Sequence, residues 1–158
     1  MKFRKEVQEQ FKNAGWYEER NLQNKYDKIK YFNELPEFLK EFLYEYGDLM
    51  VQTNDPNKTF IGTLNLKEIS KKRLKIKSYL EKPSLKNNVL TFPVGFYQNS
   101  HDNGIVECDQ FGTIYLMGEF PIIVSKNFKN GIEKIIIEDY SDTFEWNPVN
   151  KTWDRRNI

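Results

Sequence analysis

The sequence predicts a single α+β domain in which a mainly antiparallel β-sheet, arranged as a meander, is flanked by helices. Three observations lead to this prediction. Strand-like runs alternate with turn residues between positions 90 and 117, and apolar residues recur at helical spacing on either side. The length of 158 residues is ordinary for one domain. Because an isolated hairpin is marginally stable in water, the helices are expected to cover one face of the sheet.

Two helices are predicted before the sheet. The first apolar stripe consists of Phe3, Val7, Phe11 and Ala14. Gly15 suits the left-handed position that follows a helix. The second stripe consists of Leu35, Phe38, Leu39, Phe42, Leu43 and Tyr46. Pro36 is tolerated in a first helical turn, and Gly47 is expected to end the helix. Residues 17–34 are polar with scattered aromatics and are interpreted as a strand or loop.

The strands are predicted from residue 49 onward, where residues 49–52 form a strand that leads into a turn at 54–57. The strands of the meander are expected at residues 90–92, 94–98, 105–108 and 113–117, with a further strand at 120–124. Asp109 is predicted to cap one turn with its carboxylate. Gly112 is predicted to take the positive φ that closes the same turn.

The C-terminal part is predicted to hold one helix and one hairpin. Ser125 is expected to cap the helix, although Gly131 costs about 1 kcal/mol relative to alanine inside it. The apolar side of this helix consists of Phe128, Ile132, Ile135 and Ile136. Residues 140–158 are expected to form a C-terminal hairpin extension of the domain, with a turn at 147–150.

A basic helix is predicted over residues 65–82, where Asn65 and Glu68 have the spacing of a capping box. The surrounding segment 58–86 carries nine basic and two acidic side chains, a net charge of +7. The whole chain has a net charge of only +1, which argues against a dedicated nucleic-acid binder. A solvated helix face is therefore the favoured interpretation. Nucleic-acid binding is the alternative, and it requires exposed aromatic rings for stacking.

The sequence offers little catalytic chemistry. His101 is the only histidine, and its neighbour Asp102 does not by itself orient a general base, so an exposed loop histidine is the favoured interpretation. Cys108 stands between Glu107 and Asp109, whose carboxylates disfavour a thiolate. One histidine and one cysteine cannot form a zinc site, and no calcium loop or phosphate-binding glycine motif is present in the sequence. We therefore predict that the protein is not an enzyme and needs no cofactor.

The sequence also indicates a compartment. Its first 16 residues carry charges throughout and have no apolar signal-peptide core. No window approaches the roughly 20 apolar residues of a membrane span. The single cysteine excludes a disulfide within the chain. We expect a cytoplasmic protein with no membrane contact.

Several landmarks occur together in a recognisable order. They are Ala14-Gly15-Trp16 with Arg20, the run FLKEF at 38–42 leading into YGDL at 46–49, FPVG at 92–95, and ECDQFGTIY at 107–115. In this order and spacing they resemble the third branch of the SUKH superfamily, the Smi-Knr-type bacterial immunity proteins of polymorphic toxin systems. The resemblance covers roughly residues 8–138. Where the family typically has a second glycine after Gly47, this chain has Asp48.

The resemblance implies an α+β fold and a non-catalytic role. Proteins of this family bind a cognate toxin domain, often a nuclease or a deaminase, and block it. The family landmarks have physical roles in the fold: the glycines form turns, Trp16 and Tyr115 are core or corner aromatics, and Asp109 is a turn cap. None of these glycines, nor Trp16, Tyr115 or Asp109, is a recognition residue by its position, so the resemblance does not place the toxin-binding surface.

Candidate toxin-binding residues come instead from accessible polar positions. The loops of the meander offer Tyr97, Asn99, His101, Asp102 and Asn103. The second group consists of Asp139, Asp142 and Glu145, called here the tail carboxylates. They would suit a basic nuclease, because acidic groups steer its approach and occupy its phosphate sites. The alternative function is a nucleic-acid-binding or regulatory accessory domain that uses the basic segment 58–86.

Overall fold

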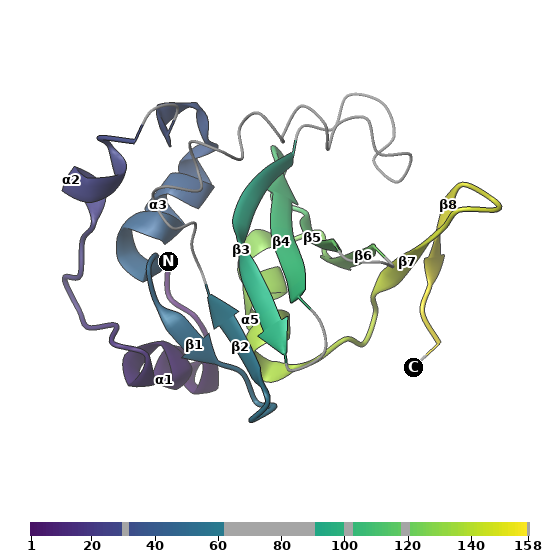
Figure 1. Cartoon of the computed structure of the whole chain (residues 1–158), viewed down its shortest axis with the longest axis horizontal. Helices are drawn as coiled ribbons and strands as arrows, with labels where there is room; N and C mark the ends of the chain where they lie inside the picture. The colour runs from purple at the N-terminus through teal and green to yellow at the C-terminus, as the bar shows by residue number, and fades with distance from the viewer. Residues whose placement is uncertain (30–31, 62–90, 100–102, 118–120, 158) are drawn as a thin grey trace.

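In the part of the chain that the structure describes, eight antiparallel strands follow one another in chain order and form one sheet (Figure 1). The computed structural model describes residues 1–29, 32–61, 91–99, 103–117 and 121–157. The strands are β1 (Met50–Gln52), β2 (Lys58–Ile61), β3 (Thr91–Asn99), β4 (Asn103–Asp109), β5 (Ile114–Met117), β6 (Ile122–Ser125), β7 (Phe144–Asn147) and β8 (Thr152–Arg155). The described helices are α1 (Lys5–Asn13), α2 (Gln23–Tyr26), α3 (Glu37–Tyr46), α5 (Phe128–Ile137) and the 3₁₀-helix η1 (Phe32–Glu34). The predicted α+β fold with an antiparallel meander is confirmed.

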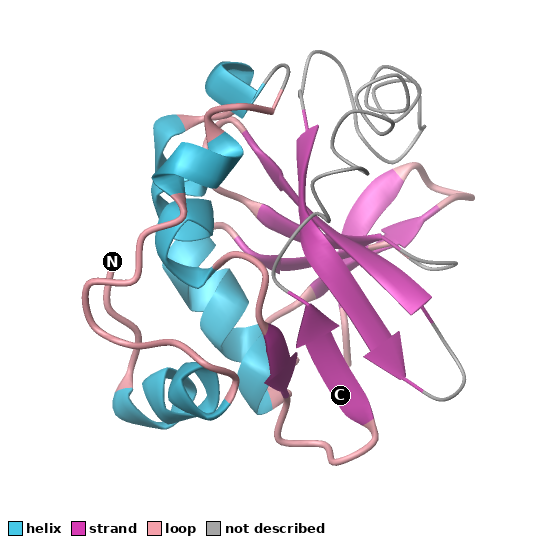
Figure 2. Cartoon of the chain, turned by 60° about the vertical axis from the view of Figure 1, so that its left-hand side comes forward, coloured by secondary structure: helices cyan, strands magenta, loops and turns pink. Residues whose placement is uncertain are grey.

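The helices gather on one side of the sheet, and the core lies between the two layers (Figure 2). The apolar stripes predicted for α1, α3 and α5 face this core. Their fully buried members are Val7, Phe11, Leu39, Phe42, Leu43, Tyr46, Ile132, Ile135 and Ile136. Trp16 folds back after α1 and stacks on Tyr46, with 5.7 Å between the ring centroids. Gly15 allows this reversal, because its φ is +113°.

The strand that opens the meander is longer than predicted. Residues 90–92 and 94–98 were expected as separate strands, but β3 runs through both with a register shift between Pro93 and Gly95 against β4. Proline has no N–H to donate to a sheet, and a bulge accommodates it. The bulge also changes the alternation of side chains, so that Phe92, Val94 and Tyr97 are all buried.

The expectation of a strand or loop at residues 17–34 is wrong at the short helices α2 and η1, whereas residues 17–22 and 27–29 are loop or turn. Two buried rings hold these turns in place: Tyr26 and Phe32 lie 5.0 Å apart between centroids. The Leu22 N–H also donates to the Tyr44 carbonyl of α3 at 2.8 Å. Helices this short owe their stability to tertiary packing, and therefore leave no periodic pattern in the sequence.

The cap of α5 is Asn127 and not Ser125. The Asn127 side-chain oxygen accepts a hydrogen bond from the Asn130 N–H at 2.9 Å, whereas Ser125 ends β6. Gly131 has a packing role, because a Cβ at this position would lie 2.5 Å from Cγ1 of Ile114. The glycine inside the helix therefore allows α5 to approach β5 closely.

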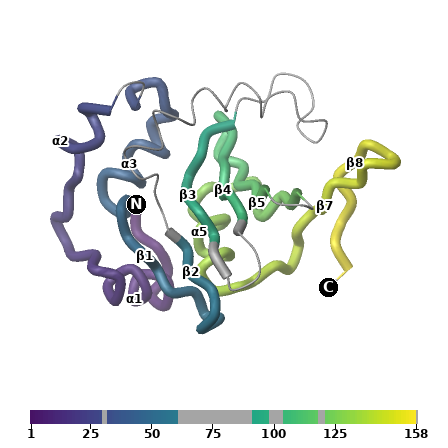
Figure 3. Tube along the Cα trace, viewed as in Figure 1, coloured from purple at the N-terminus to yellow at the C-terminus, as the bar shows by residue number. Residues whose placement is uncertain are grey.

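The chain after α5 crosses to the edge of the sheet and ends in the hairpin of β7 and β8, called here the tail hairpin (Figure 3). β7 pairs with β6, and Trp146 pairs with Trp153 across the hairpin. The predicted basic helix at residues 65–82 lies outside the described residues. Among the helices that the structure describes, none is long and apolar enough to cross a membrane.

Candidate functional site

The turn between β4 and β5, called here the Asp109 turn, is fixed by one carboxylate. One oxygen of Asp109 accepts hydrogen bonds from the N–H groups of Phe111 at 2.8 Å and Thr113 at 3.0 Å. The other oxygen accepts from the Tyr115 hydroxyl at 2.9 Å. Gly112 has a φ of +93°, as the turn requires. Both predicted roles, the cap and the positive φ, are confirmed.

A side chain that sequence analysis did not single out projects from this turn. Phe111 is 77% exposed, although the backbone of the turn around it is held by the hydrogen bonds of Asp109. On the other side of the turn, a Cβ at Gly112 would be 3.5 Å from Cβ of Phe128, so the turn lies against the start of α5. The turn thus presents an aromatic ring outward from a backbone that is held on its inner side.

Arg20, part of the family-like landmark after Trp16, holds the end of α3. Its guanidinium donates to the carbonyl oxygens of Glu45 at 2.7 Å and Gly47 at 2.6 Å. These carbonyls have no partner inside the helix, so a cation is favourable there. Burial lowers the pKa of Arg20. The role of Arg20 is therefore to position the fold.

Gly47 ends α3 by a different means from the one expected of a turn-forming glycine. Its φ is −65°, and the left-handed residue is Asp48, with a φ of +59°. Aspartate tolerates this conformation better than most residues, so it can replace the glycine typical of the family. Gly47 is needed for space, because a Cβ there would lie 2.2 Å from the Tyr26 hydroxyl and 2.4 Å from the Leu43 carbonyl.

The groups with nucleophilic or metal-binding chemistry are placed unfavourably for catalysis. Cys108 is buried, and the pKa of its thiol is raised well above the ordinary value by burial and then by Asp109 and Glu107. The thiol therefore stays protonated at neutral pH. Within the described residues, no group of three or more His, Cys, Asp or Glu side chains could hold a metal ion.

Tyr97 does not occupy an accessible loop, which corrects the expectation from the sequence. It lies in β3 and is 6% exposed. Its hydroxyl donates to Glu138 at 2.7 Å, and Lys58 lies 3.3 Å from the other oxygen of that carboxylate. Burial raises the pKa of Tyr97, and hydrogen bonds to Tyr140 and Glu138 raise it further. The ring therefore packs between the sheet and the end of α5.

The other candidates of the meander lie around the connection from β3 to β4. Asn99 is the last residue of β3 and Asn103 the first of β4, and Asn103 pairs with Gln98 in the ladder. His101 and Asp102 lie outside the described residues. The two asparagines are thus brought to one end of this hairpin.

Each of the tail carboxylates has a local partner. Asp139 accepts from the Ser141 N–H at 3.0 Å and hydroxyl at 2.5 Å, and these bonds lower the pKa of Asp139. Asp142 pairs with Arg155, and Glu145 lies 3.6 Å from Arg156. The tail is therefore a surface of mixed charge.

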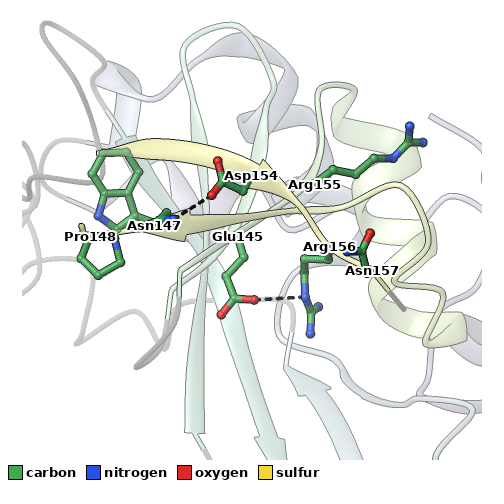
Figure 4. A pocket seen from close by; sticks show the side chains of 8 residues that line it. Glu145, Asn147, Pro148, Asp154, Arg155, Arg156 and Asn157 are labelled. Carbon is green, nitrogen blue, oxygen red and sulfur yellow. Dashed lines mark hydrogen bonds and ion pairs between the residues drawn. The ribbon is translucent and has the colours of Figure 1, made fainter. Parts of the chain in front are cut away.

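Two cavities adjoin these carboxylates. Asp139 and Asp142 line a cavity of about 360 Å³ between β6 and α5, together with Lys126 and Lys134. Glu145 lines a second cavity, of about 540 Å³, that is formed entirely by the tail hairpin and its last residues (Figure 4). The figure shows the ion pair of Glu145 with Arg156 beneath β8. The structure thus divides the tail carboxylates between two surfaces.

Sequence reasoning missed the two arginines that neutralise the tail. Arg155 is the last residue of β8 and Arg156 follows it, and the register aligns Phe144 with Arg155 and Glu145 with Asp154. A signal was available: once residues 140–158 are read as a hairpin, acidic residues of its first half and basic residues of its second half must come near each other.

One of three comparisons with known proteins identifies a family. No curated protein and no solved structure matches the chain. A protein-family model described as SUKH-3 immunity protein matches residues 3–138, which begin just before α1 and end just after α5. The match includes the Asp109 turn and leaves out the tail hairpin. Because it covers most of the chain, the protein belongs to the SUKH-3 immunity protein family.

Proposed function

We propose that this protein binds one cognate toxin domain and neutralises it without catalysis, in the cytoplasm of a bacterial cell. The family match over residues 3–138 carries this proposal. The protonated, buried thiol of Cys108 supports it, because the only cysteine is not placed as a nucleophile. A nuclease or a deaminase is the proposed class of toxin.

A toxin that acts inside the cell must be blocked almost completely, so we propose an affinity in the nanomolar range or tighter, about −12 kcal/mol. An interface of about 1,600 Å² in total would suffice. A few anchor residues are expected to carry most of the energy. The end of the hairpin of β3 and β4, with Asn99, His101, Asp102 and Asn103, remains one proposed contact region, from which the buried Tyr97 is excluded.

The tail carboxylates remain the second proposed region, and their arginine partners modify how they would work. The pair of Asp142 and Arg155 is exposed, with 71% and 67% of the side-chain surface accessible. An exposed pair contributes only about 0–1 kcal/mol, so basic groups of a toxin can replace the arginine at little cost. The basic side chains of a nuclease would thus take the place of the tail arginines beside these carboxylates.

The test is co-expression with the toxin domain encoded beside this gene. Cells should survive with both proteins and die with the toxin alone, and the two proteins should elute together from a sizing column. A catalytically inactive toxin then allows the affinity to be measured by calorimetry. Death in both cultures, with no complex on the column, would contradict the proposal.

The alternative, nucleic-acid binding by segment 58–86, is favoured only by the net charge of +7 in that segment. Replacing Lys71, Lys72 and Lys75 with glutamine separates the two functions. We expect the triple variant to fold normally and to bind the toxin as the parent does. Micromolar binding of RNA or DNA by the parent, which weakens steeply with salt and disappears in the variant, would support the alternative.

A further inference from the structure

The Asp109 turn combines a rigid backbone with an exposed aromatic ring. Asp109 is 3% exposed and accepts three hydrogen bonds, two from the turn backbone and one from Tyr115. None of these bonds involves the side chain of residue 111. Phe111 nevertheless carries a ring that is 77% exposed. The fold therefore leaves the side chain at position 111 free to serve another purpose.

A single exposed apolar residue is common on a protein surface, so its setting must carry the argument. Phe111 differs from the exposed Tyr17 and Val149 in how firmly its backbone is held. The backbone beside it is fixed by a buried carboxylate and by contact of Gly112 with the first turn of α5. An anchor that is already held in place loses little conformational entropy when it binds, and a phenylalanine has only two side-chain torsions to restrict.

A positive charge lies beside the same turn. Ser125, the residue before Lys126, has Ile114 as its partner in the ladder of β5 and β6, and Ile114 begins β5 directly after the turn. Lys126 also lines the cavity between β6 and α5, together with Asp139 and Asp142. Lys126 is exposed, and its side chain forms no ion pair with any residue that the structure describes. A cation near an apolar anchor favours a partner whose apolar pocket has an acidic group on its rim.

We propose that Phe111 is the principal anchor for the cognate toxin, and that the toxin receives it in an apolar pocket with an acidic group that faces Lys126. This inference rests on the proposed function and names the part of the surface that performs it. Position 111 lies between the residues that build the turn, so its side chain can change with the toxin while the turn stays the same. Specificity for one toxin would thus be encoded at little cost to the fold.

The test compares Phe111→Ser with Val149→Ser. Val149 is 87% exposed and lies at the turn of the tail hairpin, so it is a matched control for loss of exposed apolar surface. Binding of the purified, inactive toxin domain is measured by calorimetry, and thermal melting confirms that both variants fold. We expect Phe111→Ser to weaken binding at least about 30-fold, and Val149→Ser to change it less than about threefold.

Lys126→Glu tests the charged part of the inference. We expect about tenfold weaker binding at low salt, mainly through a slower association rate, with the difference disappearing at high salt. An unchanged affinity would show that no acidic group of the toxin faces Lys126, and this part of the inference would be wrong. Phe111→Gln, which keeps a side chain of similar length at position 111, serves as a second variant if the serine variant melts earlier than the parent.

The outcomes separate the two proposals. If the parent protein binds the toxin and both Phe111 variants bind within about threefold of it, the anchor inference is wrong and the proposed function stands. If the parent protein does not bind the toxin, the proposed function fails and the anchor inference fails with it. If the parent protein alone forms a dimer that Phe111→Ser dissociates, the ring contacts a second copy of this chain, which also overturns the inference.

Discussion

Two turns of this molecule use the same local chemistry in different surroundings. In the Asp109 turn, a side-chain oxygen accepts hydrogen bonds from the second and fourth backbone N–H groups that follow it. In the tail hairpin, the Asn147 side-chain oxygen accepts from the N–H groups of Val149 at 3.0 Å and Asn150 at 3.1 Å. Each turn contains a residue with positive φ, Gly112 in one and Lys151 in the other. Each also exposes one apolar residue two positions after the cap.

Because their surroundings differ, the two caps contribute differently to the stability of the fold. Asp109 is buried, and its second oxygen accepts from the buried Tyr115 hydroxyl. Asn147 caps a turn of exposed residues, and its amide donates to the exposed Asp154 at 2.8 Å. The Asp109 turn lies within the family match and the tail hairpin lies outside it. A hydrogen bond whose loss leaves buried groups unpaired stabilises far more than one that water can replace.

The largest effect is expected from Asp109→Ala. This change leaves the Tyr115 hydroxyl and two turn N–H groups without their partner, which should lower the free energy of unfolding by about 3 kcal/mol. Urea unfolding followed by tryptophan fluorescence measures the loss. A midpoint equal to that of the parent would show that water satisfies these groups and that the two turns are equivalent.

Gly112→Val should lower the free energy of unfolding by about 1–3 kcal/mol, because a β-branched residue is strained at positive φ. The opposite change in the other turn, Lys151→Gly, relieves such strain while making the unfolded chain more flexible. Its effect should therefore stay within about 1 kcal/mol. Thermal melting of both variants tests the pair. A loss of stability from Lys151→Gly as large as that from Gly112→Val would contradict the comparison.

Asn147→Ala should lower the free energy of unfolding by only about 0.5 kcal/mol, since water can replace the cap in an exposed turn. The change should appear instead as faster amide exchange in β7 and β8. Hydrogen exchange detected by NMR measures it, with β4 and β5 as the internal reference. Equal acceleration in both hairpins would indicate that the tail is coupled to the core more strongly than its contacts suggest.

The smallest effect concerns pH. Hydrogen bonds from Asn147 and Thr152 lower the pKa of Asp154 below its ordinary value. Because the folded hairpin favours the ionised carboxylate, this contribution is present above the ordinary pKa and is lost as pH falls through the lowered pKa. NMR titration should show Asp154 moving back toward its ordinary pKa in Asn147→Ala. An identical titration in both proteins would mean that the Asn147 bond does not form in solution.

Some features of the candidate site could be predicted from the order of residue types along the chain, and others could not. Asp109 and Gly112 were predictable, because a turn cap and a left-handed glycine are requirements of the short turn itself and do not depend on distant segments. Tyr97 was misplaced because its face depends on the bulge between Pro93 and Gly95, which the pattern of alternation does not reveal. The neutralising arginines were missed because a cross-strand pair depends on register, which is set by the whole sheet.

The sequence by itself determined the apolar stripes of α1, α3 and α5, the Asp109 turn and the family. These features depend on residues within a few positions of one another, so short-range geometry suffices. Only the tertiary structure decided that Gly47 and Gly131 are needed for space, one beneath Tyr26 and the other beneath Ile114. It also decided that Phe111 is left exposed. Such outcomes depend on which distant segments pack together, because burial is a property of the assembled core and not of any single stretch of chain.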